Sequence, residues 1–107
     1  KNFFFGCEAD DPMTTVAFNE KLGLRLKTLL GSDIGHFDVV DATEVIEEAW
    51  EMVEHGFISR ANFREFTFEN AVTLHGGMNP EFFKGTVIET EAGRNLLKAE
   101  AEFRNRK

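Results

Sequence analysis

The chain has 107 residues, a length that suits one domain with a modest hydrophobic core. Its 19 acidic residues outnumber the 12 basic ones, so the formal net charge is -7. This charge repels the phosphates of nucleic acids and the anionic head groups of lipids. We therefore expect neither nucleic acid nor a membrane surface as a partner.

Cysteine and aromatic usage add to this description. A single cysteine, Cys7, cannot form an internal disulfide, so we expect a cytoplasmic protein. The sequence has no apolar stretch of the roughly 20 residues that a membrane-spanning helix needs. Phenylalanine contributes 12 residues and tyrosine none, a content that favours packing against other apolar surfaces.

The first predicted elements alternate between strand and helix. An apolar run over residues 2–6 is expected to form a strand. Asp11 followed by Pro12 is typical of a helix start, which predicts a helix over residues 12–21. A second strand is expected over residues 25–30. The order strand, helix, strand indicates a parallel sheet.

The rest of the chain is predicted to be mainly helical. Residues 42–55 carry apolar side chains on one face and glutamates on the other, which predicts a helix with Asp41 as its N-cap. Two further helices are expected over residues 59–66 and 67–75, with Ser59 and Thr67 as their caps. Residues 85–88 are expected to form a short extended piece.

The most informative segment follows the second strand, where the apolar run stops at Gly31 and leads to Asp33 and His36. Ligands and catalytic groups collect at the carboxyl ends of parallel strands, because the loops there line the mouth of the sheet. Asp33 and His36 are therefore candidate site residues, the alternative being a turn aspartate beside a surface histidine. Glu8 follows the first strand on the same side, and its alternative role is in a capped helix start.

These motifs, in this order, resemble the carboxyl-terminal end of the metal-dependent amidohydrolases, specifically the second amidohydrolase family. The resemblance spans roughly residues 3–89 and implies an α/β fold, the C-terminal part of a TIM (β/α)8 barrel with its last two βα units and terminal helices. It rests on Gly31-Ser32-Asp33 with His36 three positions on, an acidic amphipathic helix, Gly56-Phe57-Ile58-Ser59 and Phe68-Glu69-Asn70-Ala71.

The resemblance also implies roles for particular residues. Asp33 would be the catalytic carboxylate that binds or faces a divalent metal, zinc or manganese, in a hydrolase or decarboxylase acting on a small organic substrate. A metal lowers the pKa of a bound water toward about 7, and a nearby carboxylate can accept its proton. His36 would line the pocket or contact the substrate, and Glu8 is a candidate substrate contact from its position on the exit loop of the first strand. Residues 1–90 would belong to the barrel and residues 91–107 to a charged tail, helical or disordered.

The resemblance further implies that other parts of such an enzyme complete the site. The histidine ligands of the family's earlier strands have no counterpart here, and one aspartate cannot hold a metal. We therefore expect the isolated chain to be helix-rich, catalytically inactive and unable to bind the metal. Two strands leave open sheet edges, which predicts a homo-oligomer.

A second hypothesis makes the chain a stand-alone acidic helical module that binds other proteins through its phenylalanine-rich surface. DNA binding through residues 59–75 is a weaker idea, which the negative charge and the few basic residues there argue against. Cys7, His55 and His75 are expected to be structural.

Overall fold

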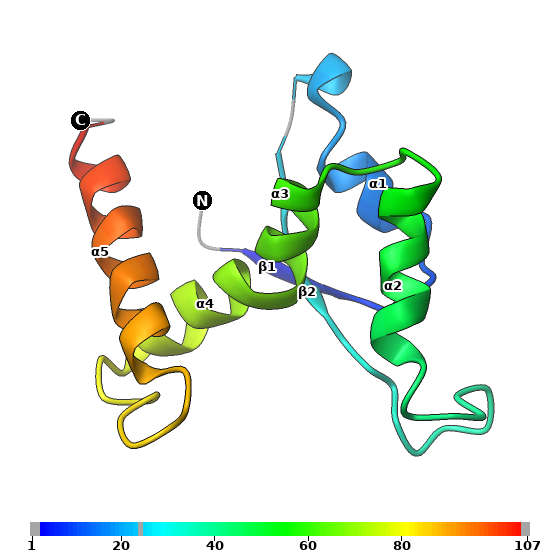
Figure 1. Cartoon of the computed structure of the whole chain (residues 1–107). Coiled ribbons are helices and arrows are strands. Elements are labelled where there is room, and N and C mark those ends of the chain that lie inside the picture. Colours follow the sequence, from blue (N-terminus) through cyan, green and yellow to red (C-terminus); the bar gives the residue numbers. More distant parts are fainter. Residues whose placement is uncertain (1–2, 24, 106–107) are drawn as a thin grey trace.

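The structure, a computed structural model, describes residues 3–23 and 25–105 (Figure 1). Among these residues, no helix is both long and apolar enough to cross a membrane. The elements are β1 (Phe4–Cys7), α1 (Met13–Ala17), the 3-10 helix η1 (Glu20–Leu22), β2 (Lys27–Leu30), α2 (Val45–Glu54), α3 (Arg60–Arg64), the π-helical segment η2 (Glu65–Glu69), α4 (Asn70–Met78) and α5 (Glu89–Asn105).

The sheet consists of β1 and β2, which pair in parallel with Phe5 opposite Thr28 and Cys7 opposite Leu30. The connection between them runs through α1 and η1, because parallel neighbours need a crossover rather than a tight hairpin. The predicted parallel pairing is thus confirmed. The first helix is shorter than expected, since α1 ends at Ala17 and the chain continues as a 3-10 turn.

The predicted TIM barrel is wrong. The described residues contain two parallel strands and several helices in a small α/β unit, with no series of repeated strand and helix pairs. A barrel closes only when every strand is paired on both sides, and eight strands form the TIM barrel. Beyond β2 the described chain continues through α2, α3, η2, α4 and α5. Strand and helix alternation near the amino end therefore indicated parallel pairing but not the size of the sheet.

The core gathers residues from α1, α2, η2 and the loops between elements, and the last residues of the two strands, Cys7 and Leu30, pack against it. Phe66, in η2, is completely buried there. Asn70, also buried, donates a hydrogen bond from Nδ2 to the carbonyl oxygen of Thr28 in β2, at 3.0 Å. The buried residues that share this cluster are Ala9, Ala17, Phe18, Val45, Ala49, Met52, Ile58 and Phe66.

Helix α2 begins later than the sequence pattern predicts, and Asp41 is not its N-cap. The Asp41 carboxylate instead accepts hydrogen bonds from the backbone N–H of Thr43 at 2.8 Å and from its hydroxyl at 2.6 Å. Both hydrogen bonds stabilise the ionised carboxylate and hold the pKa of Asp41 below its usual value. The bond from the hydroxyl has the larger effect and the bond from the backbone N–H the smaller one. Such a local turn competes with helix capping, and the helix starts only at Val45.

The helix start at Ser59 is confirmed in detail. Its side chain accepts a hydrogen bond from the backbone N–H of Asn62 at 3.1 Å, and the Asn62 side chain accepts one from the backbone N–H of Ser59 at 3.1 Å. The predicted break at Thr67 is wrong, because its hydroxyl donates to the carbonyl oxygen of Phe63 inside a continuous helical run. Residues 85–88 form turns and not a strand.

The charged segment at the carboxyl end is a helix, α5, packed against α4. The two helices approach closely at Gly76, where a Cβ atom would lie 2.7 Å from Cδ1 of Leu96. Asn95, which is buried, donates from Nδ2 to the carbonyl oxygen of Glu69 at 3.1 Å. Glycine thus leaves room for the leucine, and the amide fixes the position of α5 along its neighbour.

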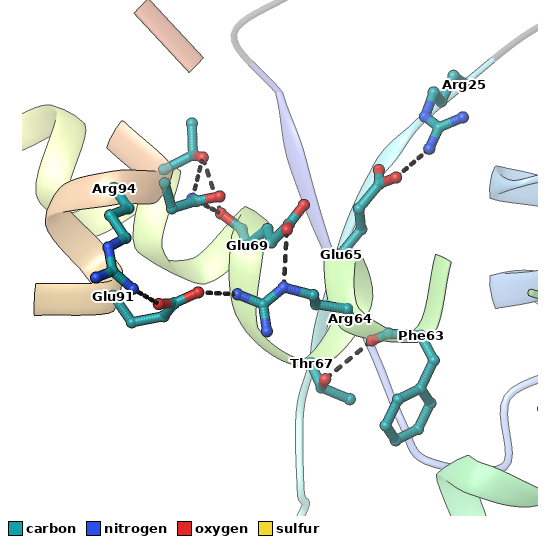
Figure 2. Close-up of polar contacts among 10 residues, drawn as sticks. Arg25, Phe63, Arg64, Glu65, Thr67, Glu69, Glu91 and Arg94 are labelled. Carbon is teal, nitrogen blue, oxygen red and sulfur yellow. Dashed lines mark hydrogen bonds and ion pairs between the residues drawn. The ribbon is translucent and has the colours of Figure 1, made fainter. Parts of the chain in front are cut away.

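A network of charged side chains reinforces this packing (Figure 2). Figure 2 shows the Arg64 guanidinium between two carboxylates, 3.0 Å from Glu69 and 2.6 Å from Glu91. Arg94 contacts the other oxygen of Glu91 at 3.2 Å. The network links α3, η2 and α5. Because its members are partly exposed, each pair contributes little, about 0–1 kcal/mol.

Replacing the central aromatic side chain tests this description of the core. We expect Phe66→Ala to lower the free energy of unfolding by about 3–5 kcal/mol, because it removes a completely buried ring and leaves a cavity. Urea titration followed by circular dichroism measures the change. Phe37→Ala is the control, since the Phe37 ring is exposed. Equal urea midpoints for the two variants would contradict the assignment of Phe66 to the core.

Candidate functional site

The candidate site begins where β2 ends. Asp33 has a positive φ of 49°, a left-handed conformation that aspartate and asparagine adopt more readily than most residues. The backbone N–H of His36 donates to the carbonyl oxygen of Asp33 at 3.1 Å, which closes a tight turn. The turn brings the side chains of Asp33 and His36 to the same side of the loop.

The two side chains are in direct contact. Nδ1 of His36 lies 2.8 Å from Oδ2 of Asp33. The aspartate side chain is 25% exposed and the histidine side chain 68% exposed, so the carboxylate is the better sheltered group. The structure thus brings together the two residues that the sequence singled out after the second strand.

Asp38 joins this pair, a residue that sequence reasoning missed. One ligand atom each from Asp33, His36 and Asp38 lies within 4.8 Å of the others. Two carboxylates and an imidazole are donors that suit zinc or manganese, and three protein ligands are usual in catalytic zinc sites. These residues therefore fit the divalent metal that the resemblance implies. The sequence offered one indication that Asp38 belongs to this cluster, because Asp38 follows His36 by two residues in the same loop.

A hollow of about 260 Å³ opens at the carboxyl ends of both strands. The backbone N–H of Gly31 donates to the carbonyl oxygen of Cys7 at 2.8 Å, so the two strand exits lie side by side. The structure therefore places Glu8 and Asp33 on one hollow. Among the described residues His36 does not line it. The lining residues are Gly6, Cys7, Glu8, Asp11, Gly31 and Asp33.

The hollow is acidic, since three of its lining side chains are carboxylates. One of them also has a structural role, because Asp11 accepts a hydrogen bond from the backbone N–H of Met13 at 2.8 Å, at the start of α1. Glu8 and Asp33 are the other two. This arrangement attracts cations and hydrogen-bond donors and repels anions. Asp33 both lines the hollow and contacts His36, so it connects the hollow to the three-residue cluster.

The other candidates from the sequence have structural surroundings. The ring of His75 stacks on that of Phe82 with centroids 4.9 Å apart, and His55 lies against Phe57 at 5.8 Å. Cys7 is half-buried and packs against the core. Each of these side chains therefore has a packing contact of its own.

Comparisons of the chain with known protein families, curated proteins and solved structures find no match. The likeness to the amidohydrolases therefore remains a prediction from the order of sequence motifs. The geometry at the end of β2 stands independently of that likeness.

A manganese titration tests whether the three-residue cluster attracts a cation. We expect no stable complex with the isolated chain, because His36 and Asp38 are exposed and water competes for the ion. Brief, reversible contact would still broaden the imidazole NMR signals of His36 before those of His55 and His75, since Mn²⁺ is paramagnetic.

Asp33→Asn is the matched variant, because asparagine also tolerates the left-handed conformation and removes only the charge. We expect this substitution to abolish the preference for His36. Uniform broadening of all three histidines in the unmodified chain would show that the cluster is not a cation site.

Proposed function

We propose that this chain supplies the catalytic carboxylate, Asp33, of a metal-dependent hydrolase or decarboxylase that acts on a small organic substrate. One observation carries the proposal: Asp33 sits at the carboxyl end of a parallel strand, contacts His36 and lines the same hollow as Glu8. The motif order shared with the amidohydrolase family supports the same chemistry.

Each residue of the proposed site has a role that follows from its position. Asp33, His36 and Asp38 would hold zinc or manganese, which when bound supplies a Lewis acid that lowers the pKa of water. The Asp33 carboxylate only accepts hydrogen bonds, so it can orient a water molecule and take its proton. Glu8 lines the same hollow as Asp33 and can accept a hydrogen bond from a substrate donor.

We further propose that the isolated chain does not catalyse this reaction. Two of the three metal-binding side chains are exposed, and the hollow is open rather than enclosed. Efficient catalysis needs ligands fixed by surrounding contacts and a site that excludes water. Residues from outside this chain would complete the site.

Cytoplasmic location and self-association belong to the same proposal. The single cysteine, which cannot form an internal disulfide, supports a reducing compartment. Self-association is supported by the sheet, because the described residues pair only two strands and Phe3 and Phe5 remain exposed beside its edge.

The decisive experiment measures turnover by the full-length protein that contains this chain, supplied with Zn²⁺ or Mn²⁺. Decarboxylation is tested with small aromatic carboxylic acids, and the release of carbon dioxide is measured. Hydrolysis is tested with the corresponding amides. We expect Asp33→Asn to lower kcat/KM by about 10²–10⁴-fold, the usual contribution of a positioned proton acceptor.

Glu44→Gln serves as the control, because Glu44 is an exposed acidic residue that makes no capping hydrogen bond. We expect it to leave the rate unchanged. Thermal unfolding should be the same for Asp33→Asn and the unmodified protein, which separates a catalytic role from a structural one. An undiminished rate in Asp33→Asn would overturn the proposal.

A further inference from the structure

Helices α2 and α3 carry a second hollow, which shares no lining residue with the hollow at the strand ends. Its volume is about 490 Å³, and we call it the Trp50 groove. Trp50 and Phe63 meet there edge to face, with ring centroids 5.0 Å apart. The groove combines apolar and acidic side chains: Ile46, Glu47, Trp50, Glu51, Glu54 and Phe63.

Helix α2 has one broad apolar side, and the core covers only part of it. Val45, Ala49 and Met52 are buried. Ile46, 54% exposed, and Trp50 lie one turn apart in the groove and form a partly exposed stripe at the margin of that apolar side. An exposed apolar stripe beside a row of charged side chains is a surface on which an amphipathic helix can pack.

The charges beside this stripe favour a basic occupant. Glu47, Glu51 and Glu54 recur at intervals of four and three residues, so they follow one side of the helix. The guanidinium of Arg60 already lies over the ring of Trp50 at 5.2 Å, so the glutamates, and not the ring, are the groups that favour incoming cations. The groove thus suits a helix that presents basic side chains around a small apolar centre.

Helix α5 has such a face. Ala92 and Asn95 are buried on its inner side. The outer side carries basic and small apolar residues at helical spacing, namely Arg94, Leu97, Lys98, Ala101 and Arg104. Arg94 and Arg104 contact acidic neighbours on their own helix at 3.2 and 3.8 Å. Exposed pairs of this kind are weak, so these cations remain able to bind other carboxylates.

The groove and this helix cannot meet within one molecule. Figure 1 shows α5 at one end of the structure and α2 at the other, with α4 and the strands between them. Helix α5 has 17 residues and α2 has 10, so α5, about 25 Å long, is long enough to cover α2, about 15 Å long. A second copy of the chain can supply the helix.

We propose that the Trp50 groove binds the basic face of α5 from a second copy of this chain. Leu97 and Ala101 of one copy pack on Ile46 and Trp50 of the other, and the cations of α5 face the glutamates of α2. The inference rests on the proposed self-association, names its surface and does not depend on the metal site. Because the two surfaces differ, repeated pairing builds rings or chains, or a reciprocal dimer.

Trp50 offers a direct measurement, since it is the only tryptophan and the chain has no tyrosine. Sedimentation velocity and tryptophan emission are recorded over one concentration series. We expect the emission to shift to shorter wavelength as the mass increases, because the incoming helix removes water from the ring. About 1 M NaCl, where the Debye length is about 3 Å, should weaken both changes.

Two charge-reversed variants test the pairing itself. The groove variant carries Glu47→Lys and Glu51→Lys, and the helix variant carries Lys98→Glu and Arg104→Glu. We expect each alone to self-associate at least about tenfold more weakly, since like charges then face each other. An equimolar mixture should associate again, because the reversed groove of one variant then faces the reversed helix of the other.

The control variant carries Glu44→Lys and Glu48→Lys, two exposed positions of the same segment that do not line the groove. It should associate like the unmodified chain. Monomers at every concentration would overturn the proposal, as would a mixture that fails to associate. Oligomers with unchanged Trp50 emission would overturn it too, and would point to the sheet edge while leaving the proposed self-association intact.

Discussion

The structure depends on the contact between the segment η2 and strand β2. Two parallel strands have little stability by themselves and need apolar cover. Phe66 supplies that cover from η2, and the bond from Asn70 to the carbonyl oxygen of Thr28 fixes the helical run on the strand. The same run carries α4, on which α5 packs through Gly76 and Asn95. Helix α5 is therefore positioned relative to the strands through this one contact.

The candidate site follows from the parallel pairing of the strands. Parallel strands end at the same edge, so the loops after β1 and β2 leave side by side. This places Glu8 and Asp33 on one hollow although they are distant in sequence. The left-handed turn at Asp33 then folds its own loop back, which adds His36 and Asp38. Acidic side chains gather here because two loops with a similar composition meet.

Helix α2 shows why an amphipathic pattern alone does not describe a surface. Its apolar residues were expected to share one buried face, but Val45 is buried while Ile46 is largely exposed. Of the apolar side of α2, only Val45, Ala49 and Met52 are buried in the core. The partly exposed stripe of Ile46 and Trp50 borders the glutamates on one side and contributes to the Trp50 groove. Burial thus depends on where the neighbouring helices lie, and the glutamates by themselves do not decide it.

The sequence by itself determined the features that arise within a few residues: the strand positions, the helix cap at Ser59, the net charge and the place of Asp33 just after a strand. Only the tertiary structure decided the number of strands, the continuous helix through Thr67, the inclusion of Asp38 and the docking of α5. The reason is physical, because caps and turns are local hydrogen bonds, whereas these other features depend on burial and pairing between distant residues. Asn70 and Thr28, which are 42 positions apart, illustrate such a contact.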